Sequence, residues 1–166
     1  AGDPGGLASF LIALGTLAAM VGVTLQGRKS LKLYALAIGA LTGVVLSHAH
    51  NDHTGRLPQL VKAGYAGPIY ASPATRALTE FILLDGAKLQ REEYERNLRH
   101  GRVTRPPLFE EKDVAQALAQ FQIVEFDRDS TPGGVSLRLQ RAGHIPGSAS
   151  LVFRADSECF VFSGDV

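Results

Sequence analysis

The pattern of apolar and polar positions from residue 44 onward predicts short strands and helices in alternation. Residues 44–46 form a compact apolar run, which indicates a buried strand over residues 44–47, and residues 68–71 indicate a second strand. Between them, residues 54–63 predict a helix, with Pro58 early in the segment. A strand, a helix and a strand in this order are typical of an α/β arrangement.

A long helix is predicted after the second strand. Ser72 is a favourable N-cap residue, and Pro73 suits the first helical position. The helix is expected to reach about Leu98, with a charged and solvent-exposed second half over residues 90–99. Six apolar residues line its first half, namely Ala77, Leu78, Phe81, Ile82, Leu84 and Leu89.

The remainder of the chain predicts one more helix and a group of strands. Residues 110–121 form a short amphipathic helix with Val114, Leu118 and Phe121 on its apolar side. The order of elements predicts a layered α/β fold, and a length of 166 residues suits a single domain. The predicted strands cover residues 123–126, 135–140, 150–154 and 159–163.

The segment directly after the first strand carries most of the functional information. Residues 48–53 read HAHNDH and hold three of the five histidines of the chain together with one aspartate. Imidazole and carboxylate groups are the ligands that a borderline metal such as zinc prefers. A polar surface loop is the alternative, but three of five histidines within six residues argue against a chance arrangement. A loop that leaves a strand end can also turn such side chains back toward one point.

Two later strand ends supply further candidate ligands. His144 lies in a Gly/Pro-rich turn between two strand-like runs, and Asp165 directly follows the last apolar run. Each of these residues alone would ordinarily be just a turn residue. A pair of metals about 3.5–4 Å apart needs more ligands than residues 48–53 offer. The three strand ends together therefore indicate one shared metal centre.

The order HxHxDH, histidine, aspartate resembles that of the metallo-β-lactamase superfamily. The flanking sequences narrow the resemblance, because they look like the RNA-processing β-CASP branch, which contains RNA endonucleases and exonucleases. The similarity covers residues 44–166 well and residues 1–43 only loosely. The segments that carry it are SHAHNDHTGRLPQLVKAGYAGPIYASPATRALTEFILLD, PLFEEKDVAQAL, AGHIPGSAS and FSGD.

The resemblance implies an αββα sandwich and a two-metal ribonuclease. Two Zn²⁺ ions are the expected cofactors, and RNA is the expected substrate. Asp52 and His53 are the catalytic candidates, with Asp52 placed to accept or orient the proton of the attacking water. The resemblance assigns six ligands: His48, His50 and His144 to the first zinc, Asp52 and His53 to the second, and Asp165 as the bridge.

The sequence departs from the branch at two points. The aspartate that ends the second strand of the branch is absent from residues 20–27, and losing such a supporting partner typically costs about 10–100-fold in metal affinity or activity. The inserted β-CASP domain and the last metal-ligand histidine are expected to lie outside this chain, since no histidine follows His144. Residues 1–166 are therefore expected to be the N-terminal part of a metallo-β-lactamase domain, with a second metal site short of one ligand.

The N-terminal apolar run at residues 7–25 has two interpretations. It carries no charged side chain and approaches the length of a membrane span. Gly15 and Gly22 divide it, however, and no basic residue precedes it as a signal peptide would require. The resemblance favours the opening hairpin of a β-sandwich that turns near Gly15, so no membrane contact is expected. A membrane or signal helix is the alternative.

Composition adds three expectations. The formal net charge of +1 gives no overall signal for nucleic-acid binding. Cys159 is the only cysteine and opens an apolar run, so we expect a buried reduced thiol and a cytoplasmic protein. A basic cluster after the long helix is a candidate RNA contact, although the glutamates beside it also fit a solvated loop. This cluster consists of Arg96, Arg99, His100, Arg102 and Arg105.

Three functions stay open at the level of sequence. The first is an RNA metallo-nuclease, and the second is another hydrolase of the same fold that acts on thioesters, lactams or lactones. The third is a non-catalytic metal-binding or assembly module. The flanking sequences favour the first function, and the missing aspartate favours the third. A partial domain would also expose sheet edges, so a homo-oligomer is a further expectation.

Overall fold

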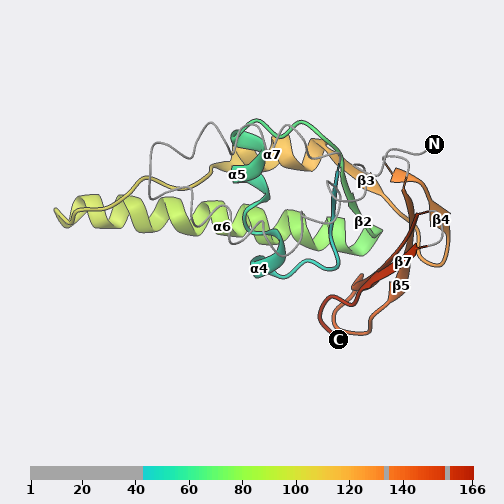
Figure 1. Ribbon diagram of the computed structural model, residues 1–166. Helices are drawn as coiled ribbons and strands as arrows, with labels where there is room; N and C mark the ends of the chain where they lie inside the picture. Colours follow the sequence, from blue (N-terminus) through green and yellow to red (C-terminus); the bar gives the residue numbers. More distant parts are fainter. Residues whose placement is uncertain (1–42, 133–134, 156–157) are drawn as a thin grey trace.

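The computed structural model describes residues 43–132, 135–155 and 158–166 of the chain. Their elements form three layers, namely a layer of helices, a parallel β-sheet and an antiparallel β-sheet (Figure 1). This arrangement confirms the predicted α/β class. The three layers correspond to the α, β and β layers of the expected αββα sandwich.

The parallel sheet is built from three short strands in the order β1-β2-β3, with Val44 opposite Ile69 and Ile69 opposite Phe121. Both connections between the strands run through helices, as parallel strands require. The predicted metal segment therefore leaves the sheet at the carboxyl end of its first strand. The strands are β1 (Val44–Val45), β2 (Ile69–Ala71) and β3 (Phe121–Ile123).

Four helices connect these strands, two in each connection. The last of them begins with a capping box, in which Glu110 and Asp113 exchange backbone-to-side-chain hydrogen bonds. This reciprocal cap satisfies two backbone donors that a helix N-terminus leaves free. The helices are α4 (Asn51–Thr54), α5 (Leu57–Lys62), α6 (Pro73–Arg99) and α7 (Glu111–Ala119).

The antiparallel sheet has the strand order β4-β5-β6-β7. Its longest ladder joins β5 and β6, where Ser136 aligns with Arg154 and Arg141 with Ala149. The turn between these two strands carries His144, as the sequence predicts. The strands are β4 (Asp129–Ser130), β5 (Ser136–Arg141), β6 (Ala149–Ala155) and β7 (Glu158–Phe162).

Alternation along β1 and β2 divides the buried apolar residues between two cores. Val44 and Leu46 face the helices, whereas Val45 faces the antiparallel sheet. In the same way Ile69 points to the helices and Tyr70 to the other sheet. The parallel sheet is therefore covered on both faces, which explains why its strands read as continuous apolar runs.

The buried face of α6 differs from the sequence-based expectation. Ser72 caps the helix as predicted, since its side chain accepts a hydrogen bond from the backbone N–H of Thr75. The six apolar residues of the first half do not form the buried face, and Phe81 and Leu89 are 73% and 56% exposed. The face that packs inward carries Thr75, Thr79, Leu83 and Ala87, at a spacing of four residues.

Three element boundaries also differ from the prediction. The helix expected at residues 54–63 is two short helices, α4 and α5, and α4 lies within the predicted metal segment itself. Phe121 begins β3 instead of ending the preceding helix, so the strand expected at residues 123–126 starts and ends earlier. Phe126 makes only an isolated bridge to Leu139. β4 was not predicted, because two polar residues carry no strand pattern.

The prediction of a buried thiol is wrong, because Cys159 is exposed. It lies in β7, whose residues are all exposed although the strand reads as an apolar run. Among the described residues, β7 pairs through its backbone with β6 alone. The expectations for residues 7–25 and for residues 20–27 lie outside the described residues. In the described part of the chain, no helix combines the length and apolarity of a membrane span.

Candidate metal centre

The segment after β1 presents two histidines toward the antiparallel sheet. His48 is fully buried, and its Nδ1 lies 3.1 Å from the hydroxyl oxygen of Ser47. His50 is the N-cap of α4, with an extended backbone, so the chain turns sharply behind it. Thr54 holds this turn, because its hydroxyl lies 3.1 Å from the carbonyl oxygen of Ala49 and 3.0 Å from that of His50.

The antiparallel sheet brings the other two side chains to the same place. His144 lies in the turn between β5 and β6, where the hydroxyl of Ser148 accepts its backbone N–H at 3.0 Å. Asp165 follows β7 after Gly164, which has a positive φ of 65°. A Cβ at Gly164 would lie 2.9 Å from the Cβ of Ser47, so only glycine allows this close approach.

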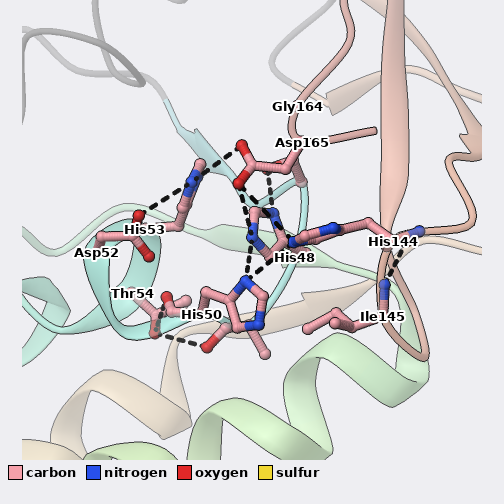
Figure 2. A network of polar contacts seen from close by, with 12 residues as sticks. His48, His50, Asp52, His53, Thr54, His144, Ile145, Gly164 and Asp165 are labelled. Carbon is pink, nitrogen blue, oxygen red and sulfur yellow. Dashed lines mark hydrogen bonds and ion pairs between the residues drawn. The ribbon is translucent and has the colours of Figure 1, made fainter.

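Three imidazole nitrogens converge on one point (Figure 2). His48 Nε2 lies 3.0 Å from His50 Nδ1, and His144 Nε2 lies 3.1 Å from the same atom. Asp165 Oδ2 stands 3.9 Å from His48 Nε2 and 3.7 Å from His144 Nε2. The candidate ligand atoms of these four residues all lie within 4.8 Å of one another. The structure thus assembles four of the six predicted site residues into one tight group.

This donor set fits a metal ion. A neutral imidazole carries a proton on only one ring nitrogen, so the contacts between nitrogens place lone pairs close together unless protons or a cation lie between them. A tetrahedral zinc ion with bonds of about 2.0–2.1 Å to nitrogen separates neighbouring ligand atoms by about 3.3 Å. Four of the distances within the group, from 3.0 to 3.9 Å, bracket this value, and all of its candidate ligand atoms lie within 4.8 Å of one another. Three imidazoles and one carboxylate are also a set that zinc accepts.

Burial prepares His48 for this role. Burial is the main cause that lowers the pKa of His48 below its usual value of 6.5, and the neighbouring His53 acts in the same direction. The side chain is therefore neutral at pH 7. Because a histidine binds metal through a deprotonated nitrogen, the lowered pKa keeps that nitrogen available.

The two remaining predicted residues lie beside the group of four. His53 Nε2 lies 3.5 Å from Asp165 Oδ1 and 3.8 Å from Asp52 Oδ2, so a carboxylate flanks this ring on either side (Figure 2). The ring of His53 also packs against that of His48, with 4.1 Å between their centroids. Asp52 is 78% exposed in its side chain and lies outside the group of four.

The geometry and the ligand order point to one family. The sequence matches the metallo-beta-lactamase superfamily over residues 2–166. The chain belongs to this superfamily.

Relatives of this metallo-β-lactamase chain include proteins named for RNA cleavage and for transcription termination. Ribonuclease TTHA0252 of Thermus thermophilus is 39% identical over 123 residues, which are 74% of this chain and 25% of the relative. Transcription termination factor FttA of Cenarchaeum symbiosum is 38% identical over 135 residues, 79% of this chain and 19% of the relative. The chain thus spans a quarter or less of the length of these relatives.

Among solved structures, the Rm3 metallo-beta-lactamase aligns with 75% of this chain and 40% of its own. The TM-score is 0.42 and the identity 21%. The assignment to the superfamily therefore rests on the sequence match.

Several residues that shape the metal centre are not candidate metal ligands, and the sequence alone assigned them no role. Ser47, Thr54 and Ser148 each place a hydroxyl on a backbone or ring atom of the site. A serine or threonine next to a metal-ligand motif is a recognisable signal, because its hydroxyl can bind nearby backbone groups. Gly164 is a second such signal, since a glycine directly before a ligand suggests a backbone that passes close to another segment.

The basic cluster lies far from the metal centre. Arg96, Arg99, His100, Arg102 and Arg105 are all exposed, at the end of α6 and in the loop that follows. Helix α6 has 27 residues, so at about 1.5 Å per residue it is about 40 Å long. The metal centre adjoins the first turns of α6, and the basic cluster lies at its opposite end (Figure 1).

Proposed function

We propose that this metallo-β-lactamase domain belongs to a zinc-dependent hydrolase that cleaves RNA phosphodiester bonds. The observation that carries the proposal is the convergence of His48, His50, His144 and Asp165 on one point. The relative named as a ribonuclease supports RNA as the substrate class.

His48, His50 and His144 would hold the proposed first zinc. Asp52 and His53 would hold the proposed second zinc, and Asp165 would be a ligand that both sites share. The orientation of Asp165 supports this bridge, because its Oδ2 faces His48 and His144 while its Oδ1 lies 3.5 Å from His53. The carboxylate thus offers one oxygen to His48 and His144 and the other oxygen to His53.

The residues of the chain divide the proposed chemistry between them. When bound, the zinc ions would supply a water of lowered pKa and positive charge for the phosphoryl oxygens. Asp52 is open to solvent and lies next to His53, so it can accept or orient a proton at the mouth of the site. Because burial lowers the pKa of His48, this buried side chain is neutral at pH 7 and can act as a ligand on the inner side of the site.

Part of the RNA contact is assigned to the basic cluster. Residues 96–105 contain four arginines and no acidic residue. None of these arginines forms an ion pair among the described residues, whereas Arg91 is paired with Glu111 at 2.6 Å. Unpaired arginines on an exposed loop are free to neutralise phosphates. The cluster would hold a stretch of RNA at a distance from the bond that is cleaved.

A substrate panel tests the proposal. The zinc-loaded protein is mixed with a single-stranded RNA, a thioester and a β-lactam, and each reaction is repeated after the metal is removed with a chelator. The proposal expects metal-dependent cleavage of the RNA alone. Hydrolysis of the thioester or the lactam with intact RNA would favour the second class of hydrolase, and inactivity of a zinc-loaded protein on all three would favour a binding module.

A further inference from the structure

The first turn of α6 contacts the turn that carries His144. Ser72, the N-cap, places its hydroxyl 2.8 Å from the carbonyl oxygen of Gly147, and the hydroxyl of Thr75 lies at the same distance from that oxygen. Both side chains are buried, at 1% and 0% exposed. Two hydroxyl donors from one helix thus converge on one carbonyl group that lies 72 or more residues away in sequence.

The close approach of the two backbones makes this contact specific. Gly147 has a positive φ of 86°, and a Cβ on it would lie 2.6 Å from the backbone nitrogen of Thr75. The same Cβ would lie 2.9 Å from the Cβ of Ala74. Position 147 therefore requires glycine for both its conformation and its space.

The turn that contains Gly147 also carries the candidate ligand His144. Within the turn, the hydroxyl of Ser148 accepts the backbone N–H groups of His144 and Ile145 at 3.0 and 3.2 Å. The next residue, Ala149, donates its N–H to the carbonyl of Ser47 at 2.8 Å, one residue before His48. The position of the His144 ring thus depends on a backbone that is held by Ser148 within the turn, by Ser47 after β1 and by the first turn of α6.

We propose that Ser72 and Thr75 are positioning residues of the metal centre, which set His144 through the carbonyl of Gly147. The inference rests on the proposed metal site. It also accounts for the buried threonine in the first turn of α6, since the hydroxyl of Thr75 contacts the carbonyl of Gly147. Here the helix packs against the backbone carbonyl of Gly147, to which a hydroxyl can donate a hydrogen bond and a methyl group cannot.

The chain offers a matched control one turn further along α6. Thr79 is also fully buried on the same face, but its hydroxyl has no hydrogen-bond partner among the described residues. Thr75→Val and Thr79→Val make the same change of side chain on the same helix face. Only the first removes a hydroxyl that contacts the His144 turn.

The test measures zinc affinity by competition with a chromophoric chelator, together with the melting temperature of the metal-free protein. Thr75→Val is expected to weaken zinc binding about tenfold, and Ser72→Ala combined with Thr75→Val up to about a hundredfold, as for other partners that orient metal ligands. Thr75→Ser keeps the hydroxyl and is expected to restore most of the affinity. Thr79→Val is expected to bind zinc like the unaltered protein.

The outcomes separate this inference from the proposed function. Equal zinc affinity in Thr75→Val and Thr79→Val would overturn the positioning role while leaving the metal centre in place. A fall in affinity that merely parallels the melting temperature in both variants would also overturn it, because it would be a general effect on stability. An unaltered folded protein that binds no zinc would overturn the proposed metal centre, and this inference with it.

Discussion

At the scale of single residues, the site is organised around a histidine that solvent does not reach. His48 combines complete burial, a hydroxyl neighbour at Nδ1 and three imidazoles in contact with its ring. Its Nε2 is thereby directed at the point where the other candidate ligands meet. An exposed histidine in a chance loop has none of these constraints, so the structure argues against the surface-loop interpretation.

Asp52 is the residue whose proposed role is easiest to separate from folding. Its side chain is 78% exposed, and its one ion pair among the described residues is with His53, at 3.8 Å. We expect Asp52→Ala to abolish RNA cleavage, because it removes the group that receives or orients the proton. The free energy of unfolding should change by no more than about 0.5 kcal/mol, as is usual at such surface positions.

Cleavage rates and chemical denaturation of the two proteins check this expectation. Zinc content serves as the control, since the group of four should keep its metal. Full activity in Asp52→Ala would refute the role, and loss of all zinc would show that Asp52 holds the centre together.

Much of this site could be predicted from sequence because its residues come from short motifs at strand ends. The residues of the group of four were all identified in this way. The single helical turn α4, which carries Asp52 and His53 inside the motif, could not be predicted. The hydroxyls of Ser72 and Thr75 could not be assigned either, since their partner lies in a distant turn.

At the scale of elements, α6 shows how a helix pattern can mislead. Several of its apolar side chains are exposed, and two of its four buried residues are threonines. The buried face of α6 therefore depends on what packs against the helix and not on where its apolar residues lie. Leu83 is fully buried, whereas the adjacent Leu84 is 38% exposed. The contacts with α4, α7 and β3 decide which side of the helix is covered.

This pair of leucines gives a direct test of the helix orientation. Leu83→Ala removes a fully buried side chain and should lower the free energy of unfolding by about 2–5 kcal/mol. Leu84→Ala should cost no more than about 1 kcal/mol, since much of its side chain is already in water. Urea unfolding of both variants measures the difference. Equal losses, or a larger loss at Leu84, would contradict the orientation.

A second element, the loop between α5 and β2, predicts a dependence on alkaline pH. Burial raises the pKa of Tyr65 well above its usual value of 10, and its hydroxyl donates to the carbonyl of Pro68 at 2.7 Å. The folded state thus binds this proton more tightly than the unfolded state. The resulting stability is fully present below about pH 10 and is lost as the pH rises further toward the folded pKa.

Urea unfolding at pH 8 and at pH 10.5 checks this dependence in the unaltered protein and in Tyr65→Phe. The unaltered protein should lose more stability between the two pH values than the variant does, because phenylalanine has no proton to lose. Burial also raises the pKa of Tyr70, so a smaller loss is expected to remain in the variant. The same loss in both proteins would exclude Tyr65 as its source.

At the scale of the whole molecule, the metal centre depends on the meeting of two sheets. The parallel sheet supplies His48 and His50, and the antiparallel sheet supplies His144 and Asp165. The backbone bond from Ala149 to Ser47 joins the two halves beside the site. The sequence-based prediction of an α/β fold is confirmed. It could be made because the alternation of helices and strands along the chain is typical of a layered fold. The relative placement of the two sheets could not be predicted from patterns within single strands.

The long reach of α6 adds a prediction about RNA binding. Replacing Arg96, Arg99, Arg102 and Arg105 with glutamine should weaken binding to single-stranded RNA. It should also lower the slope of log K against log salt by up to about 3, since each phosphate contact on a single strand contributes about 0.7. Binding curves at several salt concentrations measure this slope. Arg76→Gln with Arg91→Gln is the control, because both arginines are already ion-paired. An unchanged slope in the fourfold variant would contradict the role of the cluster.

The central claim is that this chain holds a metal at the group of four, and zinc content tests it most directly. The folded protein is dialysed against a weak chelator, and zinc per chain is measured by elemental analysis for the unaltered protein and for His144→Ala. The account predicts at least one zinc per chain in the first and a clear loss in the second. A folded protein without zinc, or the same zinc content in both proteins, would contradict it.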